Sequence, residues 1–240
     1  MDTIGASRAR PRILVVDDDT AIVRLLGQVL QEEGYQTVSS QDGVGAVQTI
    51  NDQHPALVIL DINLPKLNGF EVCRKVREVS QVPIIVVSGR GSDDDKMYAF
   101  QVGADDYVTK PFSVGELMAR VRAVLRRSAP MTVDHGDGVF QCAELEINFS
   151  ERRAWYRGRE ISTTPIEFDL LRALVLNAGR VLTHQWLLQE VWGPEYGDER
   201  EYLRVHLSHL RRKIEPDPTN PQYIQTVPRI GYRFVSQGER

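Results

Sequence analysis

The chain has 240 residues, of which 42% are hydrophobic and 26% are charged, and its formal net charge is −4. This balance is typical of a folded globular protein, and the length suits two domains of ordinary size. Because no apolar run approaches the roughly 20 residues that cross a bilayer, and the first residues lack the apolar stretch of a signal peptide, we expect a cytoplasmic protein.

Short apolar runs alternate with amphipathic stretches from Arg12 onward. The runs that predict strands lie at residues 13–16, 57–60, 84–87 and 107–109, with a further candidate around Val38. Between them, residues 21–33, 70–79 and 117–125 carry apolar side chains three and four positions apart, which is the period of a helix. This order predicts a flavodoxin-like α/β domain at residues 10–127, in which crossover helices wrap a doubly wound, five-stranded parallel sheet.

The helical pattern stops after Arg127. Residues 128–138 (SAPMTVDHGDG) are small, polar and rich in turn formers, so we predict a linker there. Alternating stretches at 144–149 and 152–158 then predict strands. Three helical segments and a closing strand pair at 225–234 follow, and together they predict an α+β domain over residues 139–236.

Polar and charged side chains follow the predicted strands of the first domain, at the point where each strand ends. They are Asp17, Asp18 and Asp19 after the first strand, Asp61 after the third, Ser88 after the fourth and Lys110 after the fifth. Because the carboxyl ends of parallel strands meet at one edge of a sheet, we expect these side chains to converge. Carboxylates that are buried together need a cation, which Lys110 and a Mg²⁺ ion would supply.

Such a pocket could carry out phosphoryl transfer. The Asp61 carboxylate could attack a phosphoryl donor and form an aspartyl phosphate, while Lys110 and the metal neutralise the transferred group and Ser88 hydrogen-bonds to it. The alternative is that these aspartates only form turns and helix caps, and Asp19 fits that interpretation best. The coincidence of suitable residues at four separate strand ends favours the pocket.

The segments VVDDD, VILDINLP, VVSG and GADDYVTKPF closely resemble the receiver domain of bacterial two-component response regulators, over about residues 10–127. The resemblance implies that Asp61 accepts phosphate from a sensor histidine kinase. It also implies that Asp18, Asp61 and the Asn63 carbonyl hold Mg²⁺, with Asp17 acting through water. Ser88 and Tyr107 would be the switch pair that turns inward on phosphorylation, and the Lys110–Pro111 peptide bond would be cis.

Receivers of the winged-helix subfamily pair through their fourth helix, fifth strand and fifth helix. The charged residues that the resemblance places on this face are Lys96, Asp105, Asp106, Glu116 and Arg120, with Arg126 or Arg127 as the partner of Asp105. Exposed ion pairs are individually worth roughly 0–1 kcal/mol, so they would set the register of a dimer rather than its affinity. We expect phosphorylation to make this face self-complementary and to give a two-fold homodimer.

A helix predicted at residues 198–215 has an apolar stripe of Leu203, Leu207, Leu210 and Ile214. The residues on its other side are Arg204, Ser208, His209, Arg211 and Arg212. Side chains three and four apart share a face, so these could enter a DNA major groove together. Residues 140–240 have as many acidic as basic residues, so this prediction rests on where the charges lie and not on net charge.

The segments TPIEFDLLRALVLNAGRVLTHQWLLQEVWG, YLRVHLSHLRRKIE and TVPRIGYRF strongly resemble the C-terminal winged-helix domain of OmpR/PhoB-type regulators, over about residues 139–236. The resemblance implies binding to double-stranded promoter DNA, with Thr226, Arg229 and Tyr232 in the wing, and RNA polymerase as a further candidate partner. Within that family, the surface helices are most similar to regulators of potassium-uptake operons.

Two other functions are open. Asp17 and Asp19 superficially match the carboxylate pair of phosphatases that use an aspartyl phosphate, but Ala21 stands where that motif needs a hydroxyl or small branched residue. We therefore expect a regulator that is not an enzyme, and turnover of a phosphoester would favour the phosphatase. The second domain could instead bind protein, as in a phosphorelay or adaptor. Strongly salt-dependent duplex binding would exclude that alternative, because phosphate contacts release counterions.

Overall fold

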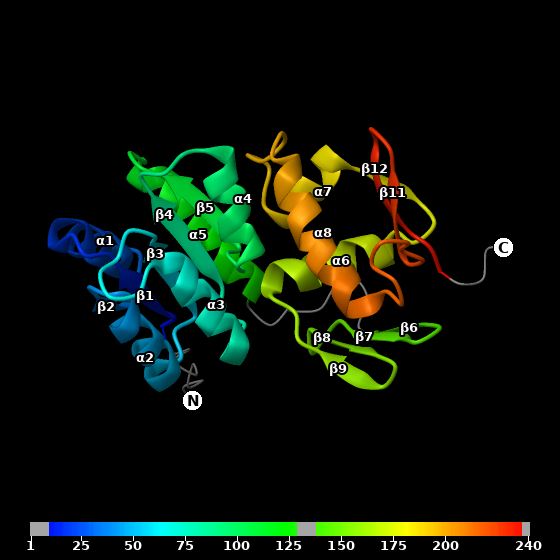
Figure 1. Ribbon diagram of the computed structural model, residues 1–240, viewed down its shortest axis with the longest axis horizontal. Helices are drawn as coiled ribbons and strands as arrows, with labels where there is room; N and C mark the ends of the chain where they lie inside the picture. Colours follow the sequence, from blue (N-terminus) through cyan, green and yellow to red (C-terminus); the bar gives the residue numbers. More distant parts are fainter. Residues whose placement is uncertain (1–9, 129–137, 237–240) are drawn as a thin grey trace, which may run out of the picture. The chain divides into compact units, whose positions relative to one another are not determined.

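The computed structural model describes residues 10–128 and 138–236. Within them the chain forms two compact units (Figure 1). One runs as far as Gly91 and includes Val102–Phe112, and the other consists of Ser92–Gln101 and the chain from Ser113 onward. Nearly all of the predicted linker lies outside the described residues, and the predicted domain boundaries stay predictions.

The first unit is built on a parallel sheet with the strand order β2-β1-β3-β4-β5. Its strands are β1 (Arg12–Val16), β2 (Gln36–Ser40), β3 (Leu57–Asp61), β4 (Ile84–Ser88) and β5 (Asp106–Thr109). The helices that join the first four strands are α1 (Thr20–Glu32), α2 (Gly43–Gln53) and α3 (Gly69–Val79). The strand order reverses between β1 and β3, so right-handed crossovers place α1 on one face and α2 and α3 on the other. The predicted doubly wound sheet is confirmed.

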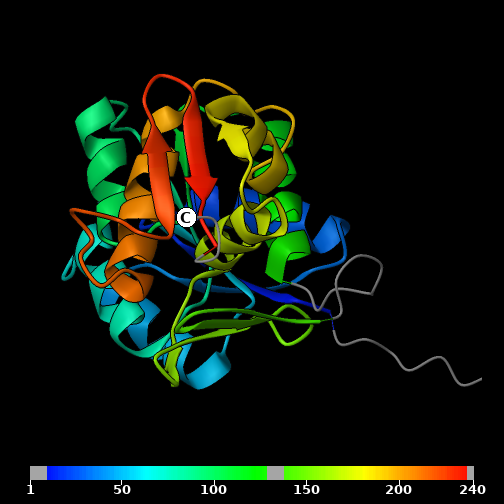
Figure 2. The same ribbon diagram turned by 90° about the vertical axis from the view of Figure 1, so that its right-hand side faces the viewer.

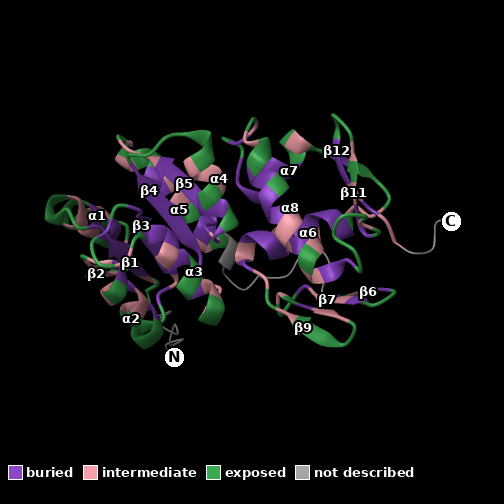
Figure 3. Ribbon diagram, in the orientation of Figure 1, coloured by how far each residue is buried: buried purple, intermediate pink, exposed green. Residues whose placement is uncertain are grey.

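The apolar pattern of the sequence explains this core. All five residues of β3 and of β4 are buried, as expected for strands that are covered on both faces (Figure 3). Asp19 is the N-cap of α1, with its side chain accepting a hydrogen bond from Ala21 N at 2.8 Å. The capping role predicted as an alternative for this aspartate is therefore confirmed.

A buried ion pair joins the end of α3 to the start of β5. Arg77 NH2 lies 2.8 Å from Asp105 Oδ2, and the same guanidinium donates to Gly103 O at 2.7 Å and Val82 O at 2.6 Å. Asp105 also accepts from Ile84 N at 2.8 Å and is 0% exposed. Its predicted position on an exposed dimer face is therefore wrong, because its carboxylate is used inside the fold.

The second unit begins with α4 (Asp93–Gln101) and α5 (Val114–Ser128). In α5, Leu117, Val121 and Val124 of the predicted apolar stripe are buried, and Leu125, its last member, is half-buried. A four-stranded antiparallel sheet follows, of which the sequence predicted only the middle two strands. Its strands, in spatial order, are β6 (Val139–Cys142), β7 (Leu145–Asn148), β8 (Arg153–Tyr156) and β9 (Arg159–Ile161). The outer strands do not alternate between apolar and polar residues, since β6 reads VFQC and β9 reads REI.

The three predicted C-terminal helices are α6 (Pro165–Leu176), α7 (His184–Val191) and α8 (Arg200–Ile214). The Thr164 side chain caps α6 and forms a capping box with Glu167. A three-stranded sheet, with the order β10-β12-β11, contains β10 (Val181–Thr183), β11 (Ile224–Val227) and β12 (Gly231–Phe234). Strands β11 and β12 form the hairpin drawn in red and orange-red (Figure 2). This is a winged helix, as the resemblance predicted.

The inner stripe of α8 packs as its sequence predicted. Leu203, Leu207, Leu210 and Ile214 are all 0% exposed. At the end of α8 the buried Glu215 carboxylate accepts hydrogen bonds from the backbone N–H groups of Gln222, Tyr223 and Ile224, which turns the chain back into β11. None of the helices in the described ranges has the length and apolarity to span a bilayer.

Candidate functional site

The carboxyl edge of the parallel sheet brings together the predicted phosphoryl-transfer residues. Lys110 Nζ lies 2.6 Å from Asp61 Oδ2 and 2.7 Å from Asp17 Oδ2. These three residues come from the ends of β5, β3 and β1, so the sheet alone accounts for their convergence. Asp61 is 5% exposed and Asp17 is 3% exposed, whereas Asp18 is exposed. The pocket therefore has two buried carboxylates and one at its rim.

Backbone contacts hold the two buried carboxylates in place. Asp17 Oδ1 accepts from Asp19 N at 2.9 Å, and Asp61 Oδ1 accepts from Asn63 N at 3.1 Å. Gly69 is a positioning residue that the sequence analysis missed. A Cβ at Gly69 would lie 2.3 Å from the Asp61 carbonyl oxygen, so only glycine lets α3 begin this close to the phosphoacceptor. The signal was the Asn68-Gly69 pair at the start of a helical pattern.

Burial and the neighbouring charges shift two pKa values in the pocket. Burial raises the pKa of Asp17, although the hydrogen bond from Lys110 opposes the rise. Burial alone would lower the pKa of Lys110, but its hydrogen bonds to Asp17 and Asp61 and the charges of both carboxylates outweigh burial and raise it. Lys110 therefore carries a positive charge, and the pocket contains one ammonium group and three carboxylate groups.

The pocket fits a divalent cation. Ligand oxygens of Asp17, Asp18 and Asp61 all lie within 4.8 Å of one another. With three carboxylates and one ammonium the pocket carries two excess negative charges, which a divalent ion would neutralise. Hard oxygen donors from a few carboxylates, with room left for water and phosphate oxygens, are the ligands that Mg²⁺ prefers.

The two predicted switch residues lie beside the pocket. Ser88 is the last residue of β4 and is 0% exposed, and its hydroxyl accepts from Arg90 N at 3.2 Å. Tyr107 is 2% exposed and its hydroxyl donates to the Arg90 carbonyl. The tyrosine ring is therefore already inside in this structure, and its predicted movement stays a prediction. The Lys110–Pro111 bond is cis, as the resemblance implied.

We expect Asp18→Asn to weaken Mg²⁺ binding by at least about tenfold, because it removes one of the three carboxylates of the pocket. Asp18 suits this test because, unlike Asp17 and Asp61, it is exposed and holds no hydrogen bond to Lys110, so its replacement leaves the buried contacts intact. Calorimetric titration with Mg²⁺ measures this change. Asp94→Asn, at an exposed position outside the pocket, is the control and should bind as the wild type does. Equal affinities for Asp18→Asn and the wild type would place the ion elsewhere.

The predicted DNA-reading residues of α8 fall into two groups. Arg204, with 66% of its side chain exposed, pairs with Glu201 at 2.8 Å, and Arg212 is exposed as well. By contrast, the Arg211 guanidinium donates to Ile224 O at 2.7 Å and to Thr226 Oγ1 at 2.9 Å, and burial lowers its pKa. Arg211 therefore fixes α8 to β11, which sequence spacing could not show, and its contact with DNA stays a prediction.

The remaining predicted residues are spread over the helix and the wing. Ser208 and His209 are half-buried, and His209 Nδ1 lies 3.7 Å from the buried Glu167 carboxylate. Lys213, which the sequence analysis left out, donates to the same carboxylate at 2.6 Å. Burial raises the pKa of the Tyr232 phenol, and the nearby charges of Arg211 and Arg204 oppose that rise. The guanidinium of Arg211 lies 5.8 Å from the Tyr232 ring centre.

Arg229 occupies the tip of the wing in a strained conformation. Ile230 N donates to Val227 O at 3.1 Å, which closes a tight turn containing Pro228 and Arg229. Arg229 has a φ of 68°, a region that normally favours glycine, and it is exposed. A non-glycine residue there costs about 1 kcal/mol or more, which makes Arg229 a position where the effect of replacing the side chain by glycine can be tested.

We expect Arg229→Gly to weaken duplex binding and to leave stability unchanged or raised by up to about 1 kcal/mol, since glycine relieves the positive φ. The slope of log K against log salt should fall by about 0.9 if one phosphate contact is lost. Anisotropy titrations at several salt concentrations and a thermal melt measure both effects. An unchanged salt slope would remove Arg229 from the set of phosphate contacts.

The charged residues predicted for a dimer face have partners within their own helices. Lys96 Nζ lies 3.6 Å from Asp93 in α4, and Arg120 NH2 lies 3.1 Å from Glu116 in α5. Asp106 is 1% exposed, so, like Asp105, it is not on an exposed face of this structure. Dimerisation through Lys96, Glu116 and Arg120 would have to exchange these pairs for contacts between subunits.

Comparisons with known proteins agree with the observed folds of both the receiver and the winged helix. The family model of the response regulator receiver domain matches residues 13–122, and that of the C-terminal domain of transcriptional regulatory proteins matches residues 158–234. The chain is 40% identical over 223 residues to the KDP operon transcriptional regulatory protein KdpE of Escherichia coli K12, covering 93% of this chain and 98% of the relative.

Two further relatives span nearly the same length. The DNA-binding response regulator MtrA of Mycolicibacterium smegmatis is 41% identical over 233 residues, covering 97% of this chain and 98% of the relative. The crystal structure of DrrB, an OmpR/PhoB homologue from Thermotoga maritima, has 31% sequence identity and a TM-score of 0.50, and covers 95% of this chain and 100% of that one.

A receiver with its acidic pocket, followed by a winged helix, defines a two-component response regulator that controls transcription through a DNA-binding domain. Within that class, the fold and the relatives agree on one group. The chain belongs to the OmpR/PhoB winged-helix family.

Proposed function

We propose that this response regulator is switched by phosphorylation of Asp61 and that the phosphoryl donor is the phosphohistidine of a sensor kinase. The observation that carries the proposal is the Lys110 ammonium at 2.6 Å from Asp61 and 2.7 Å from Asp17, at the buried floor of a pocket with Asp18 at its rim. Such a pocket can orient an anionic nucleophile and stabilise the negative charge of a transferred phosphoryl group.

The residues of the chain have separate roles in this reaction. A carboxylate oxygen of Asp61 attacks phosphorus, the phosphorus–nitrogen bond of the donor breaks, and its electron pair passes to the imidazole, which takes up a proton. Lys110 stabilises the phosphoryl oxygens. Ser88 already accepts from Arg90 N, so its O–H can donate to the incoming group. Asp18, Asp61 and the Asn63 carbonyl, with Asp17 acting through water, would hold a Mg²⁺ ion, which when bound would supply positive charge to the phosphoryl oxygens.

Phosphorylation is proposed to favour a receiver-mediated homodimer that binds tandem half-sites in promoter DNA. Arg204, Arg212 and Arg229 are exposed on the helix and the wing that would face the duplex, which supports this assignment. RNA polymerase is a further proposed partner, and the cytoplasm is the proposed location. Because the surface helices resemble those of regulators of potassium-uptake operons, potassium uptake is the proposed process under control, and the similarity to KdpE, a KDP operon regulator, supports this proposal. We propose that the protein does not act as an enzyme on a free substrate.

Light scattering tests the link between phosphorylation and assembly. The protein treated with a small phosphoryl donor and Mg²⁺ should shift from the mass of one chain to that of two at micromolar concentration. A phosphorylated protein that remained a monomer would contradict the dimer. Multiple turnover of the donor far above the rate of its own hydrolysis would instead favour the phosphatase.

A further inference from the structure

Trp186, in the first turn of α7, is a large aromatic residue that is not fully buried in the winged-helix core. The two residues that follow it, Leu187 and Leu188, are 0% exposed and fill the core, whereas Trp186 is 38% exposed. Its backbone is fixed, since the Thr183 side chain accepts a hydrogen bond from Trp186 N at 3.1 Å. Tryptophans with one accessible face and an indole N–H donor are typical of binding surfaces.

The first turn of α7 lies against the wing. His184 N donates to Ile230 O at 3.1 Å, and the His184 ring contacts the Tyr232 ring at 5.5 Å between centres. Thr183 pairs with Gly231 in the β10–β12 ladder. A Cβ at Gly231 would lie 1.9 Å from Leu182 O, so glycine is required for this close approach. His184, two residues before Trp186, is therefore held against the turn that carries Arg229.

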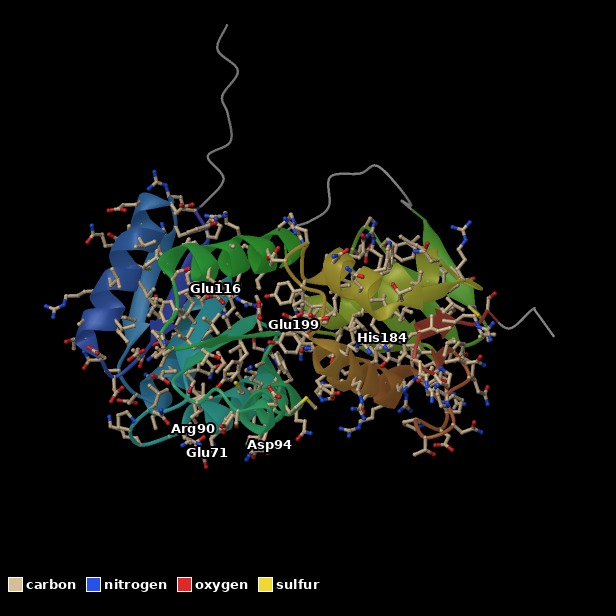
Figure 4. All side chains as sticks on the ribbon, turned by 90° about the horizontal axis from the view of Figure 1, so that it is seen from above. Glu71, Arg90, Asp94, Glu116, His184 and Glu199 are labelled. Atoms are coloured by element: carbon tan, nitrogen blue, oxygen red, sulfur yellow. The ribbon has the colours of Figure 1, made fainter. Side chains whose placement is uncertain are left out.

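The same turn also lies close to the start of the recognition helix. Burial lowers the pKa of His184, and the charge of Arg200, the first residue of α8, lowers it further. His184, which is labelled in Figure 4, therefore lies near Arg200 as well as against the wing. Arg200, and Arg229 in the wing turn that His184 contacts, are both exposed.

The chemistry around Trp186 selects one occupant. Ile230, beside Arg229, is 50% exposed, so the turn presents an apolar side chain next to a cationic one. A sugar-phosphate backbone presents apolar deoxyribose next to anionic phosphate and so matches both kinds of side chain, whereas an apolar protein partner would not match the arginines. In a helix-turn-helix the helix before the recognition helix crosses the DNA backbone.

We propose that Trp186 is a DNA-backbone contact, with its ring against deoxyribose and its Nε1–H donating to a phosphate oxygen, between the contacts made by α8 and by the wing. This inference rests on the proposed DNA-binding function. The contact carries no sequence information, so it strengthens binding to every duplex equally. Because tryptophan is uncharged, it adds affinity without adding to the salt dependence.

Anisotropy titrations of the full chain test the inference, with two duplexes of equal length: one selected by the protein from random DNA and one unrelated. Trp186→Ala should weaken binding at least about fivefold to both duplexes, with the salt slope unchanged. Trp155→Ala, at a partly exposed tryptophan on β8, is the matched control and should bind as the wild type does. An unaltered thermal melt of Trp186→Ala excludes misfolding.

A fluorescence measurement covers the case in which Trp186→Ala does not fold. In Trp155→Phe, the remaining tryptophans are Trp186 and the fully buried Trp192, so acrylamide reports mainly on Trp186. Added duplex should reduce the quenching. The proposed contact is overturned if the duplex does not reduce the quenching, or if Trp186→Ala binds DNA with unchanged affinity. It is also overturned if Trp186→Ala weakens binding only to the selected duplex, or if its only defect is in transcription with RNA polymerase. A wild type that binds neither duplex would instead refute the proposed DNA-binding function.

Discussion

Asp61→Asn is expected to abolish phosphorylation by a small phosphoryl donor, because the amide that replaces the carboxylate is not a nucleophile at neutral pH. The variant should still fold. Lys110 keeps its hydrogen bond to Asp17 at 2.7 Å, and the loss of the Asp61 charge removes a repulsion between buried carboxylates. Intact mass spectrometry after treatment with donor and Mg²⁺ measures the effect as the presence or absence of one added phosphoryl group.

Asp94→Asn provides the control for the same assay, since Asp94 is an exposed aspartate in the first turn of α4, outside the pocket. It should accept phosphate as readily as the wild type. A phosphoryl group found on the Asp61→Asn protein would move the acceptor to another residue, with Asp17 and Asp18 as the next candidates.

Arg77→Met is expected to destabilise the receiver by about 3–5 kcal/mol, which is the usual cost of removing one partner from a buried ion pair. The side chains of Arg77 and Asp105 are 14% and 1% exposed, so water cannot replace the guanidinium at the Asp105 carboxylate. Urea unfolding followed by far-UV circular dichroism should show a transition at lower urea. Tryptophan fluorescence should not change, because all three tryptophans lie beyond residue 150 and report on the winged helix.

Lys75→Met, at an exposed position on the same helix, should change stability by no more than about 0.5 kcal/mol. Combining Arg77→Met with Asp105→Asn should recover part of the loss, because the uncompensated charge is then gone. A cost below about 1 kcal/mol for Arg77→Met alone would mean that the pair contributes little to the fold.

The pocket was predictable from sequence because its geometry depends on strand order alone. Asp17, Asp61 and Lys110 each come at the end of an apolar run, and a parallel sheet brings such ends together without further information. The inner stripe of α8 was predictable for a similar reason, since helical period is a local property. In both cases the relevant signal lies within a few residues of the functional side chain.

Other features depend on contacts between distant segments, which no local pattern encodes. Asp105 follows a turn just before β5, and its sequence position predicted an exposed side chain. In the structure its carboxylate is buried and paired with Arg77, which lies 28 residues earlier in the chain. Arg211 has the helical spacing of a DNA contact, but its guanidinium donates a hydrogen bond to the Ile224 carbonyl of β11. Strands β6 (VFQC), β9 (REI) and β10 (VLT) were missed because their residues do not alternate between apolar and polar.

Binding of promoter DNA with tandem half-sites, compared between wild type and Asp61→Ala after identical treatment with a phosphoryl donor and Mg²⁺, tests the central claim most directly. We predict that only the treated wild type binds more tightly and as a dimer, while Asp61→Ala keeps the affinity of the untreated protein. Equal binding by both treated proteins would contradict control by phosphorylation and would leave a DNA-binding protein without this switch.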